Sequence, residues 1–222
     1  MPNQPTQRRY VTPESIRRIF YIYQRNYQDL ANIFAEMQKP EVFLPMWSMG
    51  NPLAIPALLD EVVRLLHNFV ASAEMWVDHT RRLMRQAYNG TKIGQEYDRE
   101  IQARFRNDLP TGFVKDLRNY TLHSELPAPL ANLYIVADQK SENGEPASDG
   151  PTPVSMTHSF ILSRDTLLAA FDWTGRSRAY LLAAPKNIDI GQAVDLHHAQ
   201  LQAFYLWLDE RLREDARQRL GG

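Results

Sequence analysis

The stretch over residues 51–88 repeats apolar side chains at spacings of three and four and contains no glycine. Asn51 and Pro52 form a helix-start signal, and Asn89 and Gly90 form a stop signal. The spacing predicts one helix over 51–88, about 55 Å long. Its apolar face is wide, so a helix of this kind belongs at the centre of a bundle or at a subunit interface.

The same periodicity predicts further helices in the first half of the chain. Thr12 and Pro13 supply a cap and a first-turn proline for the first of them. These helices are expected over 13–38, 94–108 and 111–123. Four helices joined by short links predict a mainly α protein with an up-and-down bundle.

After residue 127 the pattern changes to that of β-strands. Residues 133–136 form a short apolar run, and apolar side chains alternate over 154–162. The two segments predict a β-hairpin within 127–165. The intervening residues 138–153 contain no large apolar side chain and are expected to form a flexible loop.

The remainder of the chain again has helical periodicity. Helices are expected over 164–171, 175–183 and 190–218. Nothing in the composition separates two independent units, so residues 1–222 are interpreted as a single domain. Its expected parts are a helical core over 13–126, the hairpin, and C-terminal helices over 166–222.

Composition excludes several classes of function. The chain has 25 basic and 26 acidic residues and no cysteine. It therefore has no global basic field, no disulfide and no cysteine-ligated metal. The polar start shows no secretory signal, and no apolar run approaches the ~20 residues that span a bilayer. A cytoplasmic protein without a membrane partner is expected.

The helix predicted over 111–123 carries the chemically informative side chains. A helical wheel places its apolar residues on one side and the polar residues on the other. The polar side comprises Lys115, Asp116, Arg118, Asn119 and His123. Asn119 and His123 are four residues apart and therefore neighbours, and the long side chain of Arg118 can reach across that face. One helix thus presents a guanidinium, a carboxamide and an imidazole toward a single space.

The sequence Arg118-Asn119-x-x-x-His123 resembles the Arg-polar-x-x-x-His motif of the HEPN superfamily. The resemblance extends over the preceding bundle, about residues 13–126. It implies a compact, usually dimeric helical bundle. Many members are metal-independent ribonucleases of toxin–antitoxin, abortive-infection and CRISPR-associated phage defence systems.

By this resemblance, Arg118 and Lys115 bind substrate phosphate, His123 transfers protons and Asn119 supports the site. An arginine can hold a phosphate with two donors, and an imidazole titrates near neutral pH. No metal or cofactor is expected. A homodimer would supply the second histidine, RNA would be the substrate, and a protein antitoxin or defence partner is a further expected partner.

Two alternatives remain at this point. The polar face is equally explained by simple solvation, and the chain is then a non-catalytic helical module for protein interaction. Among the other histidines, His158 alternates with apolar residues and is expected to be a hydrogen-bonded sheet residue. His197 and His198 are adjacent on a helix, so their side chains diverge by about 100° and do not predict a metal site.

Overall fold

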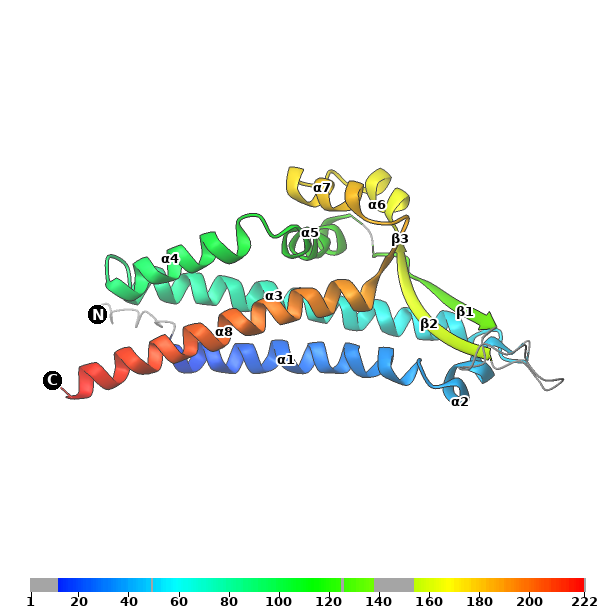
Figure 1. Cartoon of the computed structure of the whole chain (residues 1–222), viewed down its shortest axis with the longest axis horizontal. Coiled ribbons are helices and arrows are strands. Elements are labelled where there is room, and N and C mark those ends of the chain that lie inside the picture. Colours follow the sequence, from blue (N-terminus) through cyan, green and yellow to red (C-terminus); the bar gives the residue numbers. More distant parts are fainter. Residues whose placement is uncertain (1–11, 49, 125, 138–153, 222) are drawn as a thin grey trace, which may run out of the picture.

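The computed structural model describes residues 12–48, 50–124, 126–137 and 154–221. Figure 1 shows that the protein is mainly α-helical, with a small antiparallel sheet, as the periodicity predicts. The elements in chain order are α1 (Pro13–Glu36), α2 (Pro40–Phe43), the 3₁₀ helix η1 (Leu44–Trp47), α3 (Ala54–Ala87), α4 (Lys92–Phe105), α5 (Leu109–His123), β1 (Leu130–Ala137), β2 (Val154–Ser163), α6 (Arg164–Ala170), α7 (Gly175–Ala183), β3 (Asn187–Asp189) and α8 (Ile190–Gly221).

Three long helices form the body of the molecule. Figure 1 shows α1, α3 and α8 along its long axis, and α1 packs against both of the others. α4 and α5 lie on one side of this layer, and α6 and α7 lie outside α5. Within the described ranges, no helix is both long enough and apolar enough to cross a bilayer.

Short polar residues fix the helix starts. Thr12 and Ser15 cap α1 reciprocally, with the Thr12 Oγ1 accepting from the Ser15 amide at 3.2 Å. The Asp108 carboxylate accepts from the amide of Thr111 at 3.1 Å and caps α5. α5 therefore begins at Leu109, earlier than the start at residue 111 that the sequence predicts. Gly90 adopts a φ of 75° in the turn between α3 and α4, a backbone conformation that glycine favours.

The predicted hairpin is present, since β1 and β2 pair antiparallel with Leu133 opposite His158. A third strand, β3, pairs with the other edge of β2, with Ile161 opposite Asp189. The sequence predicts only a link there, because three residues are too few to show an alternating pattern. The loop expected over 138–153 lies outside the described residues.

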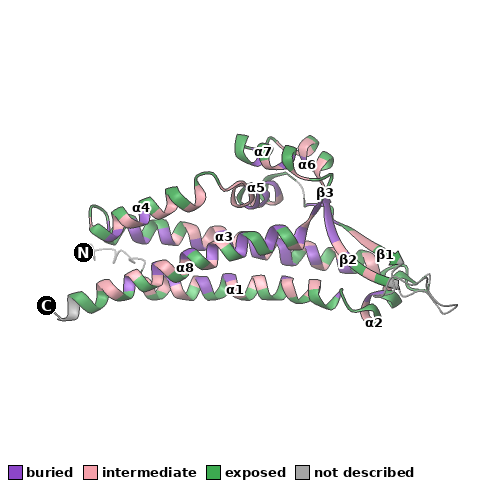
Figure 2. Cartoon of the chain, in the orientation of Figure 1, coloured by how far each residue is buried: buried purple, intermediate pink, exposed green. Residues whose placement is uncertain are grey.

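The hydrophobic core is one continuous cluster that runs from Ile16 to Leu212 among the described residues. Figure 2 shows buried residues recurring along α1, α3 and α8. α8 contributes Leu201, Phe204 and Leu208 to this cluster. The helical core therefore extends beyond the 13–126 region to which the sequence assigns it, because α8 returns along the bundle and fills it.

Asp116 is buried, with 4% of its surface exposed, and does not belong to the solvated face that the helical wheel predicts. Its carboxylate accepts hydrogen bonds from the Thr174 hydroxyl at 2.5 Å and the Ser177 hydroxyl at 2.6 Å. Thr174 and Ser177 are in the cap and first turn of α7, where the helix dipole also favours a negative charge. The wheel is wrong here because α7 covers this side of α5, which the pattern of α5 alone does not show.

Replacement of Asp116 should therefore loosen α7 from α5. Asp116→Ala leaves the buried Ser177 hydroxyl without its acceptor and removes the contact with the exposed Thr174, and it should lower the free energy of unfolding by about 1–3 kcal/mol. Urea denaturation followed by circular dichroism measures this loss. Asp172→Ala is the matched control, since Asp172 is exposed beside the same helix. An equal effect of the two substitutions would show that the Asp116 contact does not hold α7.

Candidate functional site

The structure places Arg118 and Asn119 together, half-buried on α5. The Arg118 Nη1 donates to the Asn119 Oδ1 at 3.2 Å, and the Thr121 hydroxyl donates to the Arg118 carbonyl at 2.8 Å. Asn119 therefore positions the guanidinium. No hydrogen bond within the described residues links Asn119 to the imidazole of His123.

His123 is the last residue of α5, and it is exposed. It follows Asn119 by four residues, so both lie along one side of the helix. Ser124 ends the helix, and its hydroxyl donates to the Ala170 carbonyl at 3.4 Å. His123 thus lies at a defined helix end and is exposed, where a substrate or a second protein can reach it.

Three exposed leucines follow or belong to this end of α5 in the sequence. Leu122 is 43% exposed, Leu126 after the helix is 61% exposed, and Leu130 at the start of β1 is 53% exposed. Exposed apolar surface beside polar groups is typical of a surface that another molecule covers. The motif therefore lies on an open surface whose composition fits an interface.

Lys115, the other residue predicted to bind substrate, is exposed one turn before Arg118 and Asn119. It also lines the mouth of a cavity of about 140 Å³ bounded by α3, α4, α5 and α8. The polar side of α5 thus extends from this mouth at Lys115 to the helix end at His123.

The cavity contains polar groups that the sequence did not reveal. Four buried polar atoms of its lining have no hydrogen-bond partner among the described residues: Trp76 Nε1, Thr80 Oγ1, Thr111 Oγ1 and His197 Nδ1. In the sequence Trp76 and Thr80 belong to the apolar row of the helix predicted over 51–88, Thr111 is the expected start of the next short helix, and His197 is considered only together with His198. The detectable signal is the pair Trp76 and Thr80, two hydrogen-bonding side chains one turn apart within this apolar row.

Burial lowers the pKa of His197 to about 4. Asp108 raises this pKa and the neighbouring His198 lowers it, and both effects are smaller than that of burial. His197 is therefore neutral at pH 7, with one ring nitrogen that donates and one that accepts. His198 instead stacks on Tyr27 with ring centroids 3.6 Å apart, and its Nδ1 lies 3.2 Å from the Tyr23 hydroxyl.

His158 is buried in the sheet, as expected, but it is not hydrogen-bonded. Neither ring nitrogen has a partner among the described residues, and burial lowers its pKa. Aromatic rings surround it, including Phe160 at a centroid distance of 4.7 Å and Phe43 at 6.0 Å. The prediction of a satisfied sheet histidine is wrong because α2 and η1 cover that face of β2 with apolar side chains.

Potential metal ligands are not clustered in the described part of the chain, which has no group of three or more histidine and acidic side chains. Comparisons with protein-family models, with curated proteins and with solved structures find no significant match.

The low pKa of His197 predicts a pH dependence of stability. An unfolded histidine has a pKa of ~6.5, so on acidification the unfolded state takes up the proton first. The free energy of unfolding should be constant above this pH and then fall by up to roughly 3 kcal/mol as the pH decreases to about 4. Urea denaturation at several pH values in this range measures how the free energy of unfolding changes with pH.

His197→Gln is the control, because its amide does not titrate. In this variant the free energy of unfolding should fall less steeply with decreasing pH than in the wild type. The pH dependence that remains would come from His158 and His198, whose pKa values burial also lowers. Identical slopes in the variant and the wild type would contradict a buried neutral His197.

Proposed function

We propose that this protein is a dimeric, metal-independent endoribonuclease of HEPN type. The observation that carries the proposal is the arrangement on α5: an arginine oriented by its neighbouring asparagine, with an exposed histidine one turn further along the same side. The resemblance of Arg118-Asn119-x-x-x-His123 to the HEPN motif supports the same interpretation.

The chemistry requires three groups at the scissile phosphate. A base removes the proton of the ribose 2′-hydroxyl, and the 2′-oxygen forms a bond to phosphorus. The bond from phosphorus to the 5′-oxygen breaks, and an acid protonates that oxygen. A cation stabilises the charge that develops on the phosphoryl oxygens. An imidazole can serve as base or acid near neutral pH, and a guanidinium can bind two phosphoryl oxygens.

Arg118 retains donors for this purpose. A guanidinium has five N–H donors, and the contact with Asn119 uses one of them. Lys115 lies one turn earlier on the exposed side of α5 and can bind an adjacent phosphate. Arg118 therefore binds the scissile phosphate, Asn119 orients it, and His123 transfers protons.

One imidazole does not readily perform both proton transfers in a single step, so a second copy of the chain would complete the site. In a two-fold dimer the same surface meets itself and presents two copies of Arg118 and His123. The exposed Leu122, Leu126 and Leu130 give that surface an apolar component to bury. A stable interface of this kind would cover at least ~1,000 Å² in total.

Substitution of the two central residues tests the proposal. Arg118→Ala and His123→Ala should each lower cleavage of a labelled RNA in EDTA by at least about 100-fold, since each removes a transition-state contact. Both variants should retain the wild-type circular dichroism spectrum. Arg178→Ala, which removes an exposed arginine of α7, is the control and should cleave normally. Normal cleavage by the His123 variant would reject the mechanism.

Mixing experiments test the composite site separately. Adding inactive His123→Ala chains to wild type and allowing the subunits to exchange should lower activity more steeply than the fraction of wild-type chains. The reason is that each heterodimer would contain only one of the two imidazoles. A strictly proportional decrease, or a protein that cleaves RNA while sedimenting as a monomer, would contradict the dimeric site.

A second function is favoured by the same exposed leucines. Leu122, Leu126 and Leu130 could instead bind a different protein, such as an antitoxin or a defence partner, with the polar residues only solvating the rim. The chain would then be a non-catalytic interaction module. A folded, dimeric wild-type protein that leaves RNA intact in EDTA would favour this alternative.

A further inference from the structure

The cavity between α3, α4, α5 and α8 concentrates unpaired polar atoms in one place. Trp76 and Thr80 are each 1% exposed and His197 is 4% exposed, yet each has a polar atom without a partner among the described residues. Thr111, on α5, adds a fourth such atom. Most buried polar groups in proteins are hydrogen-bonded, so four around one space indicate that a polar molecule occupies it.

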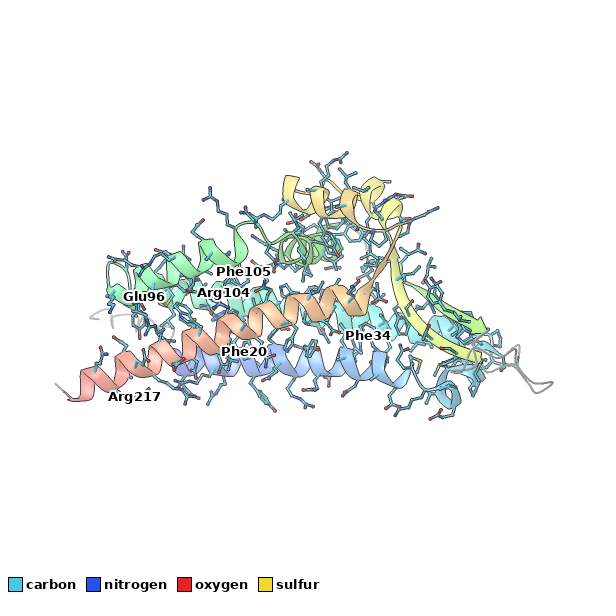
Figure 3. All side chains as sticks on the ribbon, in the orientation of Figure 1. Phe20, Phe34, Glu96, Arg104, Phe105 and Arg217 are labelled. Carbon is cyan, nitrogen blue, oxygen red and sulfur yellow. The ribbon has the colours of Figure 1, made fainter. Side chains whose placement is uncertain are left out.

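Several aromatic rings line the cavity among aliphatic side chains. Besides Trp76 they include Tyr97 and Phe105 from α4 and Phe204 from α8. The Phe204 ring lies 5.3 Å from Phe105 and 5.8 Å from Tyr97, measured between centroids, and Figure 3 shows Phe105 at the end of α4. The cavity volume, about 140 Å³, is close to the ~150 Å³ of a cavity that holds one benzene ring. The size and the walls therefore fit one planar ring.

The mouth of the cavity is predominantly cationic. Lys115, Arg81 and Arg176 line it, against the single carboxylate of Glu74. Within the described part of the chain Lys115 makes no ion pair, whereas Arg81 lies 3.6 Å from the carboxylate of Asp78. An anionic group at this mouth would meet a positive potential.

Arg176 is held at this position by its neighbours. Its Nη1 donates to the Phe105 carbonyl at 3.2 Å, which ties α7 to the end of α4. Its aliphatic stem lies directly over Gly112, where a Cβ atom would come within 2.6 Å of the Arg176 Cδ. Gly112 therefore allows the arginine to lie close to α5 beside the cavity mouth.

We infer that this cavity binds a single-ring aromatic acid that also carries a ring hydroxyl or ring nitrogen. The ring would lie among Trp76, Phe105 and Phe204, and the acid group would face Lys115 and Arg176. The ring substituent would pair with the interior polar atoms, of which the Trp76 N–H can only donate and the threonine hydroxyls can donate or accept. This inference rests on the cavity and not on the proposed RNA cleavage, although both use Lys115.

Isothermal titration calorimetry with 4-hydroxybenzoate tests the inference on the full-length protein. We expect saturable binding with one site per chain, and at least tenfold weaker binding of the uncharged 4-hydroxybenzamide. Binding of both probes with equal affinity would overturn the role of the cationic mouth. Absence of binding up to the solubility limit of the acid would show that the cavity holds ordered water only, and it would overturn the inference.

Two variants locate the site. Thr80→Val preserves the side-chain volume but removes a hydroxyl group, and should weaken binding of 4-hydroxybenzoate at least fivefold. Ala73→Leu adds volume at the cavity wall and should abolish binding. If Ala73→Leu does not fold, Thr80→Val alone tests the location of the site. Unchanged affinity of Thr80→Val for 4-hydroxybenzoate would place the ligand elsewhere and overturn the inference.

Arg178→Ala is the surface control and should bind the acid as the wild type does. RNA cleavage in EDTA, measured on the same samples, separates the two proposals. Loss of acid binding with retained cleavage in Thr80→Val would uphold both proposals. Acid binding by a protein that never cleaves RNA would uphold the cavity site alone.

Discussion

Aromatic rings from α1, α3 and α8 meet at the centre of the bundle, and the positions of the outer elements depend on that contact. The Phe20 ring stacks on Tyr205 with centroids 3.6 Å apart and lies 5.5 Å from the Trp76 ring. Trp76 in turn contacts Phe204 edge-on at 6.0 Å. Large rings bury more apolar surface than other side chains, so this cluster stabilises the return of α8 along the first helices.

The position of α8 determines where α4 and α5 can lie. Both helices contact α3 and α8, and an ion pair of 3.1 Å between Arg211 and Glu96 joins α8 to α4. α5 is then fixed from outside by the buried Asp116 and the first turn of α7. These constraints leave one side of α5 facing solvent from Lys115 to His123. They also bound the cavity beneath its N-terminal half, where side chains of α3, α4, α5 and α8 meet without filling the space and Arg176 of α7 lies at the mouth.

Much of this architecture could be predicted because helical periodicity is a local property of the sequence. The apolar stripes locate the long helices, and alternation locates the hairpin. Features that depend on contacts between distant segments could not be predicted. Asp116 is polar in the pattern of α5 but is buried by α7, and β3 is visible only through its pairing with β2. The cavity could not be predicted either. Trp76 belongs to an apolar row in the sequence, and only the packing of the other helices places it beside His197 with unpaired polar atoms.

The candidate site, too, could be predicted from the sequence only in part. The sequence identifies Arg118, Asn119 and His123 as neighbours because they lie within two turns of one helix. The pairing of Asn119 with the arginine, and the exposed leucines beside the motif, depend on rotamers and on the chain that follows α5.

The most direct test of the central claim is the dependence of cleavage on the ribose 2′-hydroxyl. An RNA oligonucleotide with a single mapped cleavage site would be compared, in EDTA, with the same oligonucleotide carrying a 2′-O-methyl group at the nucleotide 5′ of that site. The account predicts that wild-type protein cleaves the first and leaves a 2′,3′-cyclic phosphate, and that the methylated oligonucleotide stays intact at that position. Equal cleavage of the two would contradict proton transfer from the 2′-hydroxyl and, with it, the assigned role of His123.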